Sequence, residues 1–349
     1  ETDFFALAVF MIMLLKEHSL KKEKRRTKMP LVDLSEKELL EYRGRNEKPD
    51  DFDAFWDKGI REMEALGTEA EFRRADFQVQ NAECFHLYFQ GMGGSIIHGI
   101  YIRPTNVTRP APAVLEFHGY AGSVKAFSEV LGWAAAGFCY AAMDCRGQGG
   151  LSQDTASVLG TTLRGHIVRG LEDEPEKLYY RNVFLDTAQL ARIIAARPEV
   201  NERQVGAMGG SQGGGLAAAC AALTPWLARA ALRYPFLSDY RRVWEMDLDK
   251  DAYAELKDFF RWFDPRHLRE QEIFTRLGYI DVHHLASRIR ARTRLYTGLM
   301  DTLCPPSTQF AVYNHIQAPK DYQLYPDFGH EDLPGQKDDV MQFMPEMVK

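Results

Sequence analysis

From residue 111 onward, short apolar runs alternate with segments in which apolar residues recur at helical spacing. Near-continuous apolar runs are typical of strands buried on both faces, and the helical segments between them can serve as crossovers. The predicted strands cover residues 114–117, 138–143, 204–208, 228–232, 293–298 and 322–325. The predicted helices cover residues 127–136, 183–196, 217–223 and 308–315. This alternation predicts an α/β fold with a mostly parallel, doubly wound sheet.

The region before residue 111 has a different pattern. Pro-Asp-Asp at residues 49–51 precedes apolar residues at helical spacing, which predicts a capped amphipathic helix. Its apolar positions are Phe52, Phe55, Trp56, Ile60 and Met63. Segments 77–88 and 95–102, separated by the glycine-rich residues 91–94, predict the two strands of a hairpin. The sheet should therefore have an antiparallel edge on its N-terminal side.

A segment at residues 233–291 interrupts the alternation of strands and helices. It is rich in charged and aromatic residues and has little strand pattern. We expect a helical insertion there, which would act as a lid or as an association surface.

Residues 1–28 are expected to form an N-terminal extension outside the fold, which would then occupy residues 29–349. An apolar run at residues 4–15 precedes a basic cluster at residues 21–28. The run is shorter than the about 20 residues of a spanning helix, and a secretory signal has its charge before the apolar run. Three interpretations stay open: a clipped membrane anchor, a basic membrane-surface segment, and translated sequence upstream of a start at Met29, which we favour.

Composition narrows the classes of function. A chain of 349 residues that is 45% hydrophobic suits one large domain or two ordinary ones. Its net charge of −6 argues against nucleic acid as a partner. The five cysteines are scattered and form no Cys-x-x-Cys pattern, which argues against a disulfide framework and a zinc site. We expect a reducing compartment, with Cys304 as a buried apolar residue rather than a second nucleophile, and no metal at the adjacent His283 and His284.

The motif Gly-Gly-Ser-Gln-Gly at residues 209–213 stands between a predicted strand and a segment of small, helix-prone residues. A serine between glycines at a strand-to-helix turn indicates a nucleophile elbow, in which larger flanking residues would collide. The following helix N-terminus favours negative charge near the serine. The glycines lack the spacing of phosphate-binding loops, so the motif predicts that Ser211 is a nucleophile.

A serine nucleophile needs a base to take its proton, and the base needs an acid to orient it. His330 follows the last predicted strand in a Gly-His-Glu sequence, and Asp301 follows the strand before it. Side chains at the carboxyl ends of parallel strands meet at one edge of the sheet. We therefore expect Ser211, Asp301 and His330 to form a catalytic triad, with Asp327 as a weaker rival for the acid.

The oxyanion of a tetrahedral intermediate needs backbone N–H donors. One donor comes from the residue after the nucleophile, which is Gln212 here, and the other from the loop after an early strand. His-Gly-Tyr-Ala-Gly at residues 118–122 supplies that loop. We expect the N–H groups of Tyr120 and Gln212 to form the oxyanion hole.

Several strings in the chain resemble the acetyl xylan esterase and cephalosporin C deacetylase family, carbohydrate esterase family 7, within the α/β-hydrolases. They are Arg-Gly-Gln-Gly-Gly at 146–150, Gly-Gly-Ser-Gln-Gly-Gly at 209–214, Tyr-Pro-Phe-Leu at 234–237, Gly-Leu-Met-Asp at 298–301, Cys-Pro-Pro-Ser-Thr at 304–308 and Gly-His-Glu at 329–331. The resemblance covers roughly Met29 to the C-terminus. It implies an α/β-hydrolase fold with the same triad and oxyanion donors.

The resemblance also implies a serine carboxylesterase that removes acetyl groups from small acetylated sugars, such as xylo-oligosaccharides, and from cephalosporin C. It implies a cytoplasmic homohexamer with inward-facing active sites. We expect no cofactor and no membrane partner. Tyr120, Pro235 and Ala252 would contact substrate, while Arg146 and Gln148 would be structural and bind loop backbone. Relatives often have proline where this chain has Ala252, a position that helps line their acyl pocket, so the resemblance leaves acyl-chain preference open.

Other classes of function remain. A second α/β-hydrolase activity, such as that of a peptidase or a dienelactone hydrolase, is one alternative. Peptidases of this fold usually have a propeller domain, for which the chain has no room, and dienelactone hydrolases have a cysteine where this chain has Ser211. A non-catalytic binding protein is another alternative, and it would be indicated by loss of a triad residue.

Overall fold

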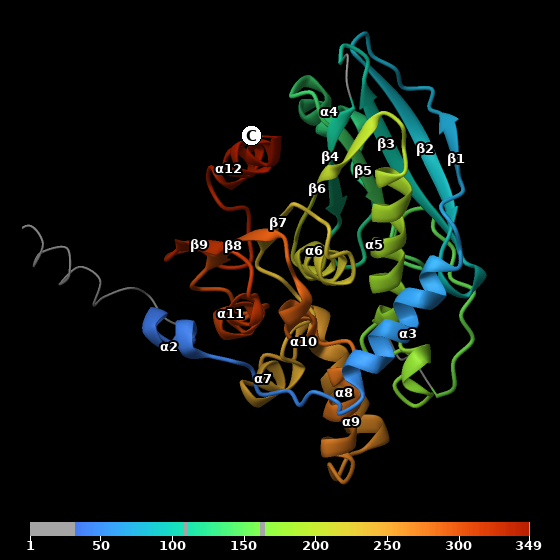
Figure 1. Ribbon diagram of the computed structural model, residues 1–349. Helices are drawn as coiled ribbons and strands as arrows, with labels where there is room; N and C mark the ends of the chain where they lie inside the picture. Colours follow the sequence, from blue (N-terminus) through green and yellow to red (C-terminus); the bar gives the residue numbers. More distant parts are fainter. Residues whose placement is uncertain (1–31, 108–109, 161–164, 349) are drawn as a thin grey trace, which may run out of the picture.

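A mixed β-sheet runs through the molecule, and helices cover both of its faces (Figure 1). The computed structural model describes residues 32–107, 110–160 and 165–348, so the expectations for residues 1–28 lie outside the described residues. In the described part, the sheet has nine strands in the order β1-β2-β3-β5-β4-β6-β7-β8-β9.

The sheet changes from antiparallel to parallel along this order. Its antiparallel part contains β1 (Ala70–Arg74), β2 (Ala82–Gln90) and β3 (Ile96–Pro104), and β3 also pairs antiparallel with β5. The parallel part contains β4 (Ala111–Phe117), β5 (Cys139–Met143), β6 (Val200–Gly210), β7 (Arg229–Arg233), β8 (Arg292–Gly298) and β9 (Lys320–Tyr325). The predicted α/β class, with an antiparallel N-terminal edge, is confirmed.

The predicted hairpin is present, because β2 pairs antiparallel with β3, but its first strand begins later than expected. Residues 77–81 belong to the turn between β1 and β2, and β1 was not predicted. The side-chain amide of Gln78 donates to the backbone oxygens of Ala75 and Cys84, both at 2.8 Å. These bonds close the turn, and a period-two pattern cannot reveal them because they depend on one side chain folding back on the backbone.

The helices form two layers, one on each side of the sheet. One layer contains α4 (Phe127–Ala135) and α12 (Gln336–Phe343). The other contains α3 (Phe52–Glu64), α5 (Tyr179–Ala195), α6 (Gln212–Leu223) and α11 (Pro306–His315), with the short α2 (Glu36–Glu41) at its margin. Successive side chains of β4 point to opposite faces of the sheet, so Val114 packs with the first layer of helices and Leu115 with the second.

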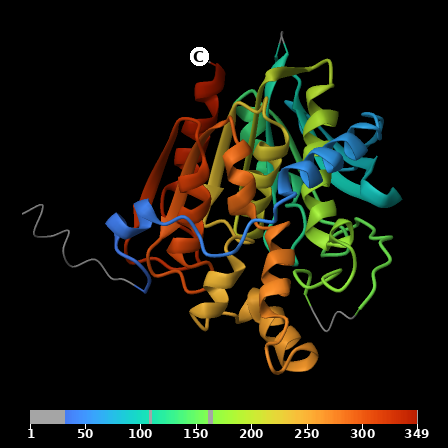
Figure 2. The same cartoon turned by 60° about the horizontal axis from the view of Figure 1, so that its bottom comes forward.

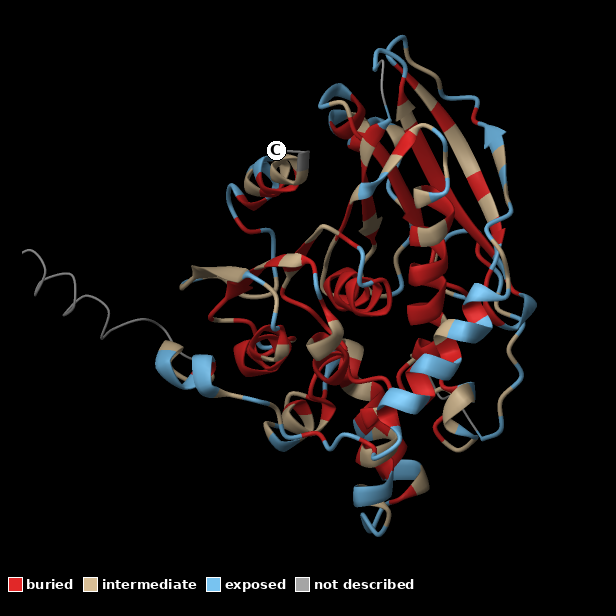
Figure 3. Cartoon of the chain, viewed as in Figure 1, coloured by how far each residue is buried: buried red, intermediate tan, exposed pale blue. Residues whose placement is uncertain are grey.

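Every residue of α6 is buried, and Figure 3 shows it in the centre of the molecule. Its sequence of Gly, Ala, Leu and Cys lets the backbone approach β4, β6 and α5 closely. All five cysteines of the chain are free and buried, and Cys220 lies on this helix. The core therefore surrounds the helix that follows the serine motif.

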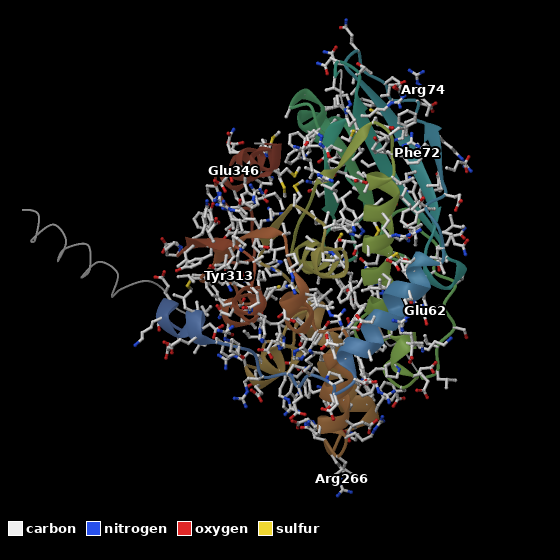
Figure 4. All side chains as sticks on the ribbon, viewed as in Figure 1. Glu62, Phe72, Arg74, Arg266, Tyr313 and Glu346 are labelled. Carbon is white, nitrogen blue, oxygen red and sulfur yellow. The ribbon has the colours of Figure 1, made fainter. Side chains whose placement is uncertain are left out.

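Between β7 and β8 the chain forms a largely helical insertion, seen in yellow to orange below the sheet in Figure 2. It contains α7 (Tyr240–Glu245), α8 (Ala254–Phe263), α9 (Glu270–Gly278) and α10 (Val282–Leu285). Arg266, between α8 and α9, marks its tip in Figure 4. Over the described ranges, the chain has no helix with both the length and the apolar character needed to cross a bilayer.

Candidate active site

Ser211 sits at the sharp turn between β6 and α6. Its backbone adopts φ +58° and ψ −125°, a conformation that is costly for a residue with a side chain. The Ser211 N–H donates to the oxygen of Arg233 at 3.0 Å, and the Ser211 oxygen accepts from Gly215 and Phe236, both at 3.1 Å. Backbone bonds to β7, α6 and the start of the insertion therefore hold the strained turn in place.

Two glycines make this turn possible. A Cβ atom on Gly209 would lie 2.3 Å from backbone atoms of Gly213. A Cβ atom on Gly213 would lie 1.9 Å from the oxygen of Phe117, at the end of β4. Side chains at these positions would force the strand and helix apart, so the glycines allow α6 to begin directly beneath the nucleophile candidate.

His330 lies in the loop after β9 and contacts both other members of the expected triad. Its Nε2 is 2.9 Å from Ser211 Oγ, and its Nδ1 is 2.9 Å from Asp301 Oδ2. The ring also packs against that of Tyr234, with 4.4 Å between centroids. The imidazole is thus held between hydroxyl and carboxylate, with 19% of the His330 side chain exposed.

Asp301 is fully buried in the loop after β8. Its Oδ1 accepts from the backbone N–H groups of Leu303 and Cys304, at 2.9 and 2.8 Å. Its Oδ2 accepts from the side-chain amide of Gln309 at 3.3 Å, in addition to its contact with His330. These donors orient the carboxylate toward the imidazole, and Gln309 is a participant that the sequence analysis missed.

Cys304 is close to the same group of residues but is fully buried. Burial, with a smaller contribution from the charge of Asp301, raises the pKa of its thiol well above the usual value. A neutral, enclosed thiol is a poor nucleophile.

The loop after β4 carries Tyr120, the other expected oxyanion donor. The N–H of Gly122 donates to the oxygen of Gly119 at 3.1 Å and closes the turn. His118 Nδ1 donates to the same oxygen at 2.7 Å, while its Nε2 accepts from the N–H of Cys145 at 2.9 Å. Burial lowers the pKa of His118, so the neutral imidazole connects this loop to the loop after β5. This role of His118 could not be recognised from sequence alone.

The side chains of Gln148 and Gln212 tie the same loop to the serine turn. Gln148 Oε1 accepts from the N–H of Ala121 at 2.9 Å. Gln212 is fully buried, and its Oε1 accepts from the hydroxyl of Tyr180 at 2.8 Å. As the first residue of α6, Gln212 has a backbone N–H with no partner inside the helix. The sequence indicates a role only for this N–H, whereas the Gln212 side chain also organises the site.

The other residues that the sequence singled out lie around this centre. Arg146 is buried and binds both oxygens of Asp186, at 2.8 and 2.9 Å, and the oxygen of Met92 at 2.9 Å. Pro235 is buried beside the first turn of α6. Ala252 is partly buried in the short helix that precedes α8.

Two clusters in the described part of the chain have a donor set that could hold a metal ion. One is Asp301, Cys304 and His330, which shares Asp301 and His330 with the expected triad. The other is Asp281, His283 and His284, and the centroids of the two imidazole rings lie 3.9 Å apart.

In this helix of a single turn, His283 Nδ1 lies 2.6 Å from Asp281 Oδ1. Both oxygens of Asp281 also accept from the N–H of Asp239 at 2.9 Å. A metal ion could bind there only by displacing these hydrogen bonds.

Comparison with known proteins identifies the family of this chain. Residues 29–347 match the family model of acetyl xylan esterase (AXE1). The chain belongs to the acetyl xylan esterase family. Both the recognised family and the expected class of enzyme, a carboxylic ester hydrolase, are confirmed.

Solved structures of this family are similar over nearly the whole chain. Acetyl xylan esterase 1 from Thermoanaerobacterium sp. JW/SL YS485 is 51% identical, with a TM-score of 0.89 over 91% of this chain and 100% of that chain. Acetyl xylan esterase from Paenibacillus sp. R4 is 35% identical, with a TM-score of 0.86 over 90% of this chain and 99% of that chain.

A curated relative is longer. Acetyl esterase Axe7A from Xylanibacter ruminicola is 27% identical over 83% of this chain. The match spans 64% of the length of that relative.

Proposed function

We propose that this chain is a serine carboxylesterase that removes acetyl groups from small acetylated carbohydrates, such as xylo-oligosaccharides, and from cephalosporin C-like esters. The observation that carries the proposal is the hydrogen-bonded series of Ser211, His330 and Asp301 at the serine turn, with both contacts at 2.9 Å. Membership of the acetyl xylan esterase family supports an acetyl ester as the substrate.

In the proposed reaction, Ser211 Oγ attacks the acetyl carbonyl while His330 takes its proton. Asp301 orients the imidazole and stabilises its positive charge. The backbone N–H groups of Tyr120 and Gln212 bind the oxyanion, and one such donor is worth about 2.7–4 kcal/mol of barrier. His330 then protonates the departing sugar alcohol. Water, activated by the same imidazole, releases acetate from the acetyl-enzyme and restores Ser211.

The packing beside Ser211 supports the proposal that the acyl group of the substrate is small. The N–H of Phe236 donates to the oxygen of Ser211, which brings the aromatic residue next to the serine turn. The Phe236 ring packs against Tyr253 and Tyr120, with centroid distances of 4.3 and 5.7 Å. We infer that these rings limit acyl length, so acetyl esters should be cleaved faster than octanoyl esters.

We also propose that the chain forms a homohexamer in the cytoplasm, as the resemblance in its sequence implies. Trp262 and Leu268, in the insertion, are 67% and 74% exposed. Exposed apolar residues of this size are common where subunits associate. Light scattering after size exclusion would measure the mass, and a monomer at micromolar concentration would contradict this part.

A fluorophosphonate probe and a substrate panel test the function. The probe should label Ser211 and abolish hydrolysis of p-nitrophenyl acetate, acetylated xylobiose and cephalosporin C. Ser211→Ala should lose labelling and turnover with an unchanged near-UV circular dichroism spectrum. Ser287→Ala is the matched control, because that hydroxyl donates to the oxygen of His284. Retention of most activity by Ser211→Ala would remove the proposal.

A further inference from the structure

A buried carboxylate in the insertion reaches the loop that carries Tyr120. Glu255 lies in the first turn of α8 and is 3% exposed. Its Oε1 accepts from the hydroxyl of Tyr120 and from the N–H of His166, both at 3.0 Å, and its Oε2 accepts from the N–H of Val168 at 2.9 Å. Three segments remote in sequence thus meet at one side chain.

The surroundings of Glu255 enclose this contact. Gly165 has φ +79°, and a Cβ atom there would lie 2.2 Å from Glu255 Oε1 and 2.7 Å from the hydroxyl of Tyr120. The backbone of Gly165 therefore packs directly over the bond between the two side chains. Burial raises the pKa of Glu255 to about 7, so keeping a carboxylate here has an energetic cost that the surrounding donors offset.

Tyr120 is fixed along its whole side chain. Its ring packs between those of Phe236 and His166, with centroid distances of 5.7 and 5.5 Å, and its hydroxyl ends at Glu255. The N–H of the next residue, Ala121, is bound by Gln148. The side chain of Tyr120 and the peptide bond that follows it are thus both restrained.

We propose that Glu255 is a positioning residue for ester hydrolysis, which holds the Tyr120 hydroxyl so that the Tyr120 N–H points at the developing oxyanion. The inference rests on the proposed function, because it needs that N–H to stabilise the transition state. Through Glu255, the helical insertion helps to align the oxyanion hole. The contact between Glu255 and Tyr120 matters most in the transition state, where negative charge develops on the substrate oxygen. Its loss therefore lowers kcat more than it changes KM.

Tyr120→Phe tests the inference with little disturbance, because it removes the hydroxyl and keeps the backbone N–H. Glu255→Gln removes the charge and leaves a single acceptor oxygen for several donors. We expect each variant to lower kcat for p-nitrophenyl acetate about tenfold, with KM within about twofold of wild type. The double variant should be no slower than the slower single variant, within about twofold, because both remove the same contact.

Tyr279→Phe is a matched control from the same insertion. The Tyr279 hydroxyl donates to a carboxylate oxygen of Asp51, remote from Tyr120 in sequence, and this variant should keep the wild-type kcat. An unchanged kcat in Tyr120→Phe would overturn the inference, even if Glu255→Gln fails to fold. A double variant whose loss equals the product of the single losses would also overturn it. A wild-type protein without esterase activity would instead refute the proposed function.

Discussion

The side-chain amides of Gln148 and Gln212 bond to each other in both directions, at 2.8 and 3.0 Å. One amide comes from the loop after β5 and the other from the first turn of α6. Because Gln148 also accepts from the N–H of Ala121, the pair fixes the separation between the two proposed oxyanion donors, Tyr120 and Gln212.

The effect of Gln148→Ala on the activation barrier, measured through kcat, should therefore be larger than its effect on the free energy of unfolding. It removes the acceptor of the Ala121 N–H and one acceptor and one donor of the Gln212 amide. We expect kcat to fall about 10- to 100-fold, which corresponds to about 1.4–2.7 kcal/mol of barrier. Steady-state kinetics would measure it, with Gln317→Ala, an exposed amide, as the control. A change in KM alone would contradict the argument.

Asp301→Asn should reduce kcat about 10³- to 10⁴-fold, because an amide N–H facing His330 Nδ1 favours the wrong tautomer of the imidazole. Asp327→Asn separates this effect from general loss of charge, since Asp327 is exposed and was the rival candidate for the acid. Near wild-type turnover of the Asp327 variant is expected. Equal losses in both variants would remove Asp301 from the triad.

Two glycine substitutions should have opposite effects on stability. Gly213→Ala places a methyl group against the oxygen of Phe117, so we expect an insoluble protein or a loss of more than about 3 kcal/mol. Gly132→Ala lies on the exposed side of α4, where its Cβ would make ordinary contacts with Met341, and should add about 0.5–1 kcal/mol. Urea unfolding measures both, and a stable Gly213→Ala protein would contradict the close approach of β4 and α6.

Acidification should destabilise the fold partly through His166. Burial, with a smaller contribution from Arg169, lowers the pKa of this imidazole from 6.5 to about 4. The unfolded chain therefore binds a proton at His166 more readily than the folded chain, and stability from this group is lost as pH falls from 6.5 to 4. The expected loss is about 1–2 kcal/mol, because the ring is partly exposed and water screens the shift.

His166→Phe should make the acid decline in unfolding free energy shallower. The ring of His166 stacks on Tyr179 at 4.6 Å, a contact that phenylalanine can keep, and its buried Nδ1 has no hydrogen-bond partner among the described residues. Urea titrations at pH 4.5 and 7 would measure the free energy of unfolding of the wild type and of His166→Phe. An unchanged difference between the two pH values would show that His166 does not contribute.

The alternation of strands and helices could be predicted because strands buried on both faces have near-continuous apolar sequences, whatever the details of their packing. The serine turn was predictable for a similar reason, since steric exclusion at Gly209 and Gly213 restricts the residue types there. His330 and Asp301 could be paired because parallel strands bring their carboxyl ends to one edge.

The supporting side chains could not be predicted. Glu255 makes its contacts with segments 87 to 135 residues away, and nothing near it in sequence marks it as different from a solvent-facing glutamate. His118 and Gln309 have the same difficulty, because their roles depend on neighbouring loops that only the folded chain brings together. β1 was missed because its short, partly exposed sequence carries little apolar signal.

The burial of all five cysteines makes the native protein a weak target for thiol-modifying reagents. Alkylation would have to wait until the molecule opens, because Cys220 and Cys304 are fully enclosed. The rate at which such a reagent labels each thiol then reports how often that part of the structure opens, without any added probe.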